Sequence, residues 1–147
     1  MPVVDASVVV DWVAPDTDPS SPALVTLRRL AAERAPLLAP RLLVEEVANA
    51  LLTGVRRRRW SGAAADLSCS SLRRLPIRLV DDSGVVERAW DLARRYDDHP
   101  IYDMLYVAVA ERARTVLITA DRQLRSRLHM LEWVIPPDVV DSVGGSA

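Results

Sequence analysis

The sequence predicts an α/β protein in which a parallel sheet is covered by helices on both sides. Segments with helical spacing alternate with short apolar segments along the chain. The short segments are apolar at successive positions, as in "TVLITA", which is typical of strands buried on both faces of a parallel sheet. The chain has 147 residues, of which 50% are hydrophobic, and this is enough for one domain with a substantial core.

The first part of the chain predicts a strand, two helices and a second strand. A short apolar run ends in Asp5, and a segment with helical spacing follows it, with Asp5 or Ser7 as its cap. "DTDPSSP" marks a turn, and beyond it three leucines and an alanine fall on one face of the second helix. "PLLAP" is a short apolar strand between prolines. These elements are expected at 3–5, 6–14, 23–35 and 36–40.

The rest of the chain continues the alternation. "RLLVEEVANALLTGVRRRR" has a strong helical pattern, and Ser61 precedes the next helix as its cap. Pro100 stands where a later helix begins. "TVLITAD" reads as a buried strand, and "EWVIPP" reads as the last strand. We expect helices at 41–59, 61–75, 83–96, 102–114 and 122–128, strands at 77–80, 115–121 and 132–137, and a flexible tail at 142–147 of a single domain spanning 1–147.

Charge and cysteine content narrow the classes of function. The net charge is −1, so no global field draws the protein to nucleic acid or to an anionic membrane. All 19 basic residues are arginine, which argues against receiver domains and haloacid-dehalogenase-like phosphatases, since both rely on a lysine. Cys69 is the only cysteine, which suits a reducing compartment. The apolar amino terminus is interrupted by Asp5 and Asp11, so we expect a cytoplasmic protein without a membrane segment.

Four acidic residues stand where a parallel sheet would bring them together. Asp103 lies in the first turn of a helix whose next residues are almost all apolar, and a bare carboxylate beside such a core is costly. Asp5 and Asp121 each close a strand, and parallel strands end at the same edge of a sheet. Glu46 lies in the first half of the 41–59 helix. We therefore expect acids from four separate segments to converge.

Each acid also has an ordinary structural interpretation. An Asp between a strand and a helix is most often an N-cap, which applies to Asp5 and Asp121. Asp103 also complements a helix dipole, and an acid such as Glu46 usually faces solvent. Together, however, four carboxylates in one pocket repel one another unless a cation is present. A ligand set made only of oxygens selects hard cations, here Mg²⁺ or Mn²⁺.

Four segments resemble the motifs of the PIN domain, most closely those of VapC-type toxins from type II toxin–antitoxin systems. The segments are "VVDASVVV" at the start, "EVANALL" at 46–52, "YDMLYVAVAE" at 102–111 and "LITADRQL" at 117–124. They occur in the family's order and span nearly the whole chain. The resemblance implies a three-layer α/β/α sandwich with a central, mainly parallel sheet. It also implies a metal-dependent endoribonuclease, inhibited by a cognate VapB-type antitoxin and usually homodimeric.

Carried over residue by residue, the resemblance assigns a catalytic and metal-binding quartet of Asp5, Glu46, Asp103 and Asp121. The three aspartates are expected to hold Mg²⁺ or Mn²⁺ directly, and Glu46 is expected to complete the shell or to bind through water. Thr119 matches a small hydroxyl residue of the family and, like Ser7, is expected to support the acids. Water activated by the metal is expected to cleave RNA by in-line attack on phosphorus, which leaves 5′-phosphate and 3′-hydroxyl ends.

The choice between Glu45 and Glu46 depends on the resemblance. Helical spacing places both residues beside the apolar stripe, and Arg41, four residues before Glu45, is able to pair with it. The family's Glu directly precedes the Val-Ala-Asn-Ala stretch, which selects Glu46. His99 lies near the acids and either meets the substrate or is an ordinary loop residue.

The "RRRRW" run at 56–60 has two interpretations. Arg56 and Arg57 are candidate RNA-binding residues, whereas a cluster of arginines at a helix end is also an ordinary solvated terminus. Trp60 either stacks on a base or, as is more common for tryptophan in a chain without phenylalanine, belongs to the core. The remaining alternative for the whole chain is a catalytically silent PIN-like module that binds RNA or protein.

Overall fold

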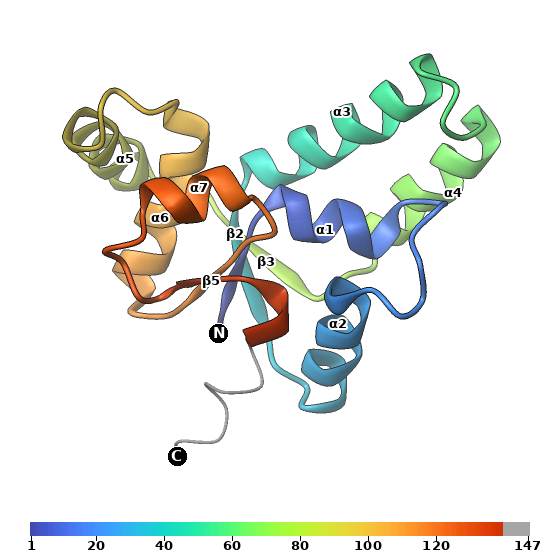
Figure 1. Cartoon of the computed structure of the whole chain (residues 1–147), viewed down its shortest axis with the longest axis horizontal. Coiled ribbons are helices and arrows are strands. Elements are labelled where there is room, and N and C mark those ends of the chain that lie inside the picture. Colours follow the sequence, from blue (N-terminus) through green and yellow to red (C-terminus); the bar gives the residue numbers. More distant parts are fainter. Residues whose placement is uncertain (140–147) are drawn as a thin grey trace.

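Five parallel strands form the centre of the computed structural model, which describes residues 1–139 (Figure 1). They lie in the order β3-β2-β1-β4-β5, and each neighbouring pair is parallel. The tail predicted at 142–147 lies outside the described residues. The strands are β1 (Val3–Val4), β2 (Leu37–Pro40), β3 (Ile77–Val80), β4 (Leu117–Ile118) and β5 (Val134–Ile135).

Helices cover both faces of this sheet. One side carries α1, α3 and α4, which pack on one another, with α2 against α1, and the other side carries α5 and α6 (Figure 1). α7 follows β4, and the 3-10 helix η1 contacts α2. The helices are α1 (Ala6–Val13), α2 (Pro22–Ala32), α3 (Leu42–Arg56), α4 (Gly62–Leu72), α5 (Ser83–Arg95), α6 (Ile101–Ala113), α7 (Arg122–Arg127) and η1 (Pro137–Val139).

This arrangement confirms the predicted α/β/α fold, with differences at the ends of elements. The strand predicted at 115–121 pairs only over Leu117–Ile118. The helix predicted at 41–59 ends at Arg56, because Arg58 takes a left-handed backbone with φ of 57°. The N–H of Arg59 then donates to the carbonyl of Gly54 at 2.8 Å, which closes the helix in a Schellman-type turn. Strand β3 is not buried on both faces, since it lies at the sheet edge and Leu79 is 41% exposed.

Helix α6, which carries Asp103 in its first turn, is largely buried. It packs on β1, β2 and β4 with one side and on α5 with the other, so apolar residues surround it. Met104 and Val107 are fully buried, and Tyr106 is 2% exposed. This explains why the segment after Asp103 reads as continuously apolar. Among residues 1–139, no helix is long and apolar enough to cross a membrane.

Candidate active site

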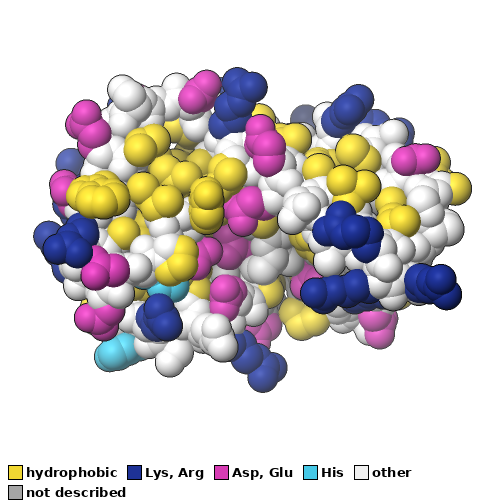
Figure 2. Space-filling model, turned by 90° about the horizontal axis from the view of Figure 1, so that it is seen from above, with side chains coloured by type: hydrophobic (Ala, Val, Ile, Leu, Met, Phe, Trp, Pro, Cys, Tyr) yellow, Lys and Arg dark blue, Asp and Glu magenta, His cyan; other side chains and the backbone are white. Residues whose placement is uncertain are grey.

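The carboxyl end of the sheet collects the starts of several helices. β1 runs into α1, β2 into α3 and β4 into α7, and α6 begins at the same upper edge (Figure 1). Figure 2 looks down on this edge and shows acidic side chains along the middle of the face, between two lobes. This is the edge at which open parallel sheets bind their ligands. The four predicted acids all belong to segments that begin here.

Asp5 is the most buried of these acids. Its side chain is 5% exposed and caps α1, since Oδ1 accepts from the backbone N–H of Val8 at 3.4 Å. The hydroxyl of Ser7 donates to the same oxygen at 2.5 Å. Burial raises the pKa of Asp5 to about 6, although the hydrogen bonds from Ser7, Thr119 and Val8 lower it, and the charge of Asp103 raises it further. Of the two caps predicted for α1, Asp5 and Ser7, the structure therefore selects Asp5.

Two hydroxyl side chains connect Asp5 to the end of β4. Ser7 Oγ accepts from the backbone N–H of Ala120 at 3.0 Å and lies 3.5 Å from Thr119 Oγ1. Thr119 is fully buried, and its hydroxyl oxygen accepts from the backbone N–H of Asp121 at 3.1 Å. The two residues predicted to support the acids therefore lie between Asp5 and Asp121.

Asp121 caps α7. Its Oδ1 accepts from the backbone N–H groups of Gln123 and Leu124 at 3.0 and 3.1 Å. The ordinary interpretation of Asp121 as an N-cap is therefore correct, as it is for Asp5. Because both bonds use Oδ1, the cap leaves the second carboxylate oxygen available.

Glu46 reaches the same region from α3 and is held by a tyrosine of α6. The hydroxyl of Tyr106 donates to Glu46 Oε1 at 2.8 Å. Burial raises the pKa of Glu46, the hydrogen bond from Tyr106 lowers it, and the charge of Asp103 raises it. The pKa of the Tyr106 hydroxyl is itself raised by burial and by the charges of Glu46, Asp5 and Asp103, so this hydroxyl stays a donor.

Asp103 is held from within its own segment. It lies in the first turn of α6, and His99 Nε2 is 2.6 Å from its Oδ2. The other ring nitrogen of His99, Nδ1, is 3.0 Å from Nη1 of Arg127 at the end of α7. His99 is 8% exposed, whereas the side chain of Asp103 is 33% exposed. The predicted acid in this apolar helix therefore has a partner, and the partner is an imidazole. The depression between the two lobes of Figure 2, where acidic side chains gather, is called the groove below.

The acids interact with one another through their charges. Asp103 raises the pKa of both Asp5 and Glu46, so the structure brings these three carboxylates within electrostatic reach. Asp121 is linked to Asp5 through Ser7 and Thr119 and perturbs neither pKa. Over residues 1–139, no arginine forms an ion pair with any of the four. A concentration of negative charge without an arginine partner favours a cation in the groove.

The residues present fit a hard divalent cation in their chemistry. All four are carboxylates, and Mg²⁺ and Mn²⁺ prefer oxygen ligands. Their positions do not form a complete metal site, however. The described part of the chain holds no group of three or more His, Cys, Asp or Glu side chains placed to bind one metal ion.

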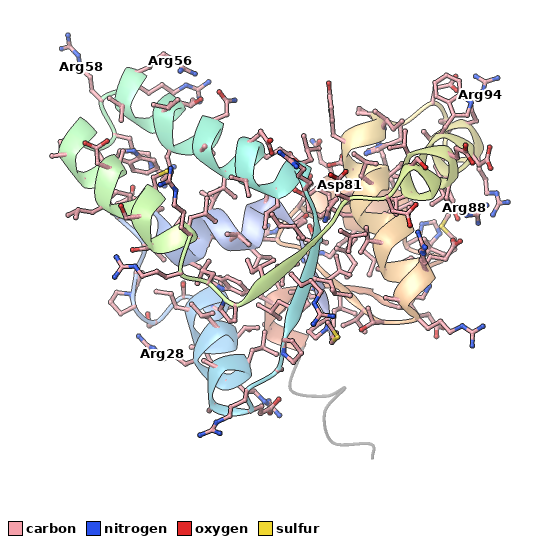
Figure 3. The ribbon with its side chains drawn as sticks, turned by 180° about the vertical axis from the view of Figure 1, so that it is seen from behind. Arg28, Arg56, Arg58, Asp81, Arg88 and Arg94 are labelled. Carbon is pink, nitrogen blue, oxygen red and sulfur yellow. The ribbon has the colours of Figure 1, made fainter. Side chains whose placement is uncertain are left out.

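The structure places the remaining candidates away from this groove. Arg41 pairs with Asp81, at 3.5 Å, and not with Glu45. Arg56 and Arg57 lie at the far end of α3, ten and eleven residues beyond Glu46, which is about 15 Å along a helix. Figure 3 shows Arg56 and Arg58 projecting from that end into solvent.

Trp60 packs into the protein and does not offer a free face for a base. Its Nε1–H donates to the carbonyl of Leu51 at 2.9 Å, and its ring fills the space above Gly54, where an added Cβ would lie 2.1 Å from the ring. The guanidinium of Arg59 covers the ring at 4.9 Å. The core interpretation of Trp60 is therefore the correct one.

Sequence reasoning missed Tyr106 and Arg127 and left His99 undecided. Tyr106 follows Asp103 by three residues, which places both on one face of α6, so its position was a usable signal. The contact between Arg127 and His99 joins residues 28 positions apart and leaves no local pattern. Only the packing of α7 against the loop before α6 reveals it.

Comparison with known proteins places the fold and the motifs in one family. Ribonuclease VapC3 of Mycobacterium tuberculosis is 34% identical over 122 residues, which cover 83% of this chain and 83% of that protein. Ribonuclease VapC9 of the same organism is 34% identical over 95 residues, or 65% of this chain and 71% of that protein. The crystal structure of VapC20, a sarcin–ricin loop cleaving toxin of M. tuberculosis, superposes with a TM-score of 0.60 at 18% identity, over 86% of this chain and 94% of that one. Residues 3–127 match the PIN domain. The chain therefore belongs to the PIN-domain family, with VapC ribonucleases among its relatives.

Proposed function

We propose that this protein is an endoribonuclease toxin of the VapC type that depends on Mg²⁺ or Mn²⁺ and is inhibited by a cognate VapB-type antitoxin. One observation supports this most directly. Acids from β1, α3 and α6 lie within electrostatic reach of one another, and no arginine of the described residues neutralises them. Relatives named as VapC ribonucleases supply the reaction class.

Each side chain of the site has a role in this proposal. Asp5, Asp103 and Asp121 hold the divalent ion, with Glu46 completing the shell directly or through a water molecule. Ser7 and Thr119 orient Asp5 and the end of β4 by the hydrogen bonds described above. A bound Mg²⁺ or Mn²⁺ would supply an acidified water and offset the negative charge of the phosphate. The protein's own part is to fix the carboxylates and to keep the groove negative until the ion binds.

The substrate contacts and partners form the finer part of the proposal. Arg56 and Arg57 would add affinity for RNA phosphates at the far end of α3, independent of base sequence. A homodimer in the cytoplasm, bound by its antitoxin, is the expected resting assembly. Light scattering of the purified protein tests the dimer, and co-expression with a candidate VapB-type antitoxin tests inhibition.

The test of the chemistry is RNA cleavage with matched acidic variants. Total RNA is incubated with wild type, Asp5→Asn, Asp103→Asn and Asp16→Asn, in Mn²⁺ and in EDTA. We expect cleavage by wild type and Asp16→Asn only in Mn²⁺, because Asp16 is a surface acid paired with Arg59 at 2.7 Å. Full cleavage by Asp5→Asn or Asp103→Asn with a native circular dichroism spectrum would rule the assignment out. Binding of RNA with neither cleavage nor Mn²⁺ uptake by wild type would favour the silent PIN-like module.

A further inference from the structure

The loop between α5 and α6 has an unusual backbone and brings a histidine to Asp103. Asp97 and Asp98 both take left-handed backbones, with φ of 57° and 56°, and this conformation is uncommon outside glycine. Arg94 pairs with Asp98 at 2.5 Å and fixes the turn from α5. His99 follows this turn directly, and Pro100 precedes the first residue of α6. A strained turn held by its surroundings places an imidazole beside Asp103.

The two contacts of the His99 ring determine where its proton lies. A guanidinium has only donors, so the approach of Arg127 Nη1 to Nδ1 at 3.0 Å requires a lone pair on Nδ1. The hydrogen of the neutral ring then lies on Nε2, which donates to Asp103 Oδ2 at 2.6 Å. The chain of contacts is therefore directional: Arg127 donates to His99, and His99 donates to Asp103.

We propose that His99, held in its Nε2–H tautomer by Arg127, is a positioning residue that orients Asp103 for a divalent cation. This rests on the proposed function, in which Asp103 holds the ion. With Oδ2 bound to His99, Oδ1 of Asp103 accepts no hydrogen bond from residues 1–139 and is the oxygen offered to the groove. Carboxylates that bind metals are commonly oriented by such outer partners.

The contact also couples two of the acids through one short helix. α7 is capped at its start by Asp121 and reaches His99 at its end through Arg127. A displacement of α7 would therefore disturb Asp121 and Asp103 together. Glu46 and Asp5 are oriented by other donors, Tyr106 and Ser7, which have no contact with Arg127. The proposal thus predicts that changes at His99 or Arg127 alter metal binding through Asp103.

The first test measures the tautomer in the metal-free full-length protein, so it does not depend on activity. Nitrogen-15 NMR of the histidine side chains is expected to show His99 with a protonated Nε2 and an unprotonated Nδ1. In Arg127→Ala this single tautomer is expected to give way to a mixture. A wild-type spectrum with the proton on Nδ1 would overturn the proposal, whatever the metal does.

The second test measures Mn²⁺ affinity by calorimetry. We expect His99→Ala to weaken binding by about 10- to 100-fold and Arg127→Ala to weaken it less. His99→Gln is expected to restore most of the affinity, since its amide places a donor near the position of Nε2. The matched control is His129→Ala, which removes an exposed histidine whose one hydrogen bond to residues 1–139 is with the carbonyl of Ser126.

The outcomes separate this proposal from the proposed function. If wild type binds no Mn²⁺, or Asp103→Asn binds it as tightly as wild type, the metal-dependent function fails and takes this inference with it. If binding depends on Asp103 but His99→Ala binds with wild-type affinity, this inference alone fails. Should His99→Ala not fold, Arg127→Ala decides in its place, because Arg127 lies at the protein surface and its removal leaves the core intact.

Discussion

Acids at the surface of this protein and acids at the sheet edge are held by different kinds of donor. Six surface acids among the described residues are paired with arginine, often at short range, as in the contacts of Arg88 and Arg94 on the outer helix α5 (Figure 3). The four site acids are held instead by hydroxyls, an imidazole and backbone N–H groups. The arginine-paired acids are Asp16, Asp81, Asp82, Asp98, Glu33 and Glu111.

The two kinds of donor differ in what they do to the charge of the carboxylate. A guanidinium orients a carboxylate and also cancels its charge, and on the surface such a pair contributes about 0–1 kcal/mol. A neutral donor orients a carboxylate and leaves its charge available for a cation. In a chain with 19 arginines, a cluster of acids without an arginine partner is therefore the informative feature.

The largest expected effect is a loss of RNA cleavage when the charge of a site glutamate is removed, in contrast to a surface glutamate. Glu46→Gln keeps an acceptor for Tyr106 but removes the charge, so we expect RNA cleavage in Mn²⁺ to fall about a thousandfold, or about 4 kcal/mol in the barrier. Its free energy of unfolding should rise in EDTA, because repulsion from Asp103 disappears. The control is Glu111→Gln, a surface acid paired with Arg88, which should cleave normally. Equal cleavage by both variants would remove Glu46 from the site.

The next effect is on the pH dependence of the free energy of unfolding, to which a buried site acid and a surface acid contribute with opposite signs. The pKa of Asp5 is raised to about 6, so between pH 4 and 6 the folded state keeps a proton that the unfolded state has lost. The contribution of Asp5 to the free energy of unfolding therefore falls as pH rises through this range, by about 3 kcal/mol, and is constant above it. Urea denaturation in EDTA, compared with Asp5→Asn, measures the difference.

Asp82 provides the opposite case. The backbone N–H of Gly84 lowers the pKa of Asp82, and so does Arg112. The contribution of Asp82 is therefore present above the unfolded pKa and is lost as pH falls through the folded one. An Asp82→Asn variant should differ less from wild type in acid than at neutral pH. If the differences for Asp5 and Asp82 had the same sign, the contrast between buried and surface acids would be wrong.

A smaller loss of stability is expected when the neutral hydrogen-bond donor of a site acid is removed. Tyr106→Phe leaves Glu46 Oε1 without its hydroxyl partner in a half-buried position. We expect the free energy of unfolding to fall by about 2 kcal/mol, the usual consequence of leaving a buried polar group unsatisfied. The matched control is Tyr102→Phe on the same helix, because Tyr102 is 59% exposed. A loss of the same size in both variants would show that the hydroxyl of Tyr106 holds nothing.

The fold was predictable because its signals are local or periodic. Alternating apolar strands and helices predicted the parallel sheet, and Ser61 as the cap of α4 is confirmed, as is Asp5, one of the two caps predicted for α1. The end of α3 was not predictable, because an arginine at 58 adopts a conformation usually reserved for glycine or asparagine. The short paired length of β4 depends on its neighbours and not on its own residues.

For the candidate site, sequence reasoning located the acids at the sheet edge but not what holds them. Asp5 and Asp121 were predicted as strand ends; Asp5 directly follows β1, whereas Asp121 lies three residues beyond β4 and caps α7. The donors come from elsewhere in the chain: Tyr106 reaches Glu46 across 60 residues, and Arg127 reaches His99 across 28. Such contacts depend on tertiary packing, which a single sequence does not encode in any short pattern. The assignment of all four acids as metal ligands stays a prediction.

The smallest effect concerns the arginines at the end of α3. Arg59 is engaged by Asp16 and Trp60, whereas Arg57 has no acid partner among residues 1–139. In an Asp103→Asn background, which is expected not to cut the RNA, we expect Arg57→Ala to weaken RNA binding a few-fold and to lower the salt slope by about one. Arg59→Ala should leave both unchanged, because the charge of Arg59 is already neutralised by Asp16.

The salt slope is the decisive quantity in this comparison, because a general loss of stability would weaken binding without changing the number of phosphate contacts. If Arg57→Ala and Arg59→Ala behave alike, the "RRRR" run is only the solvated end of α3. The RNA contacts would then be sought among other basic side chains, such as Arg122 and Arg125 of α7, the helix that Asp121 caps.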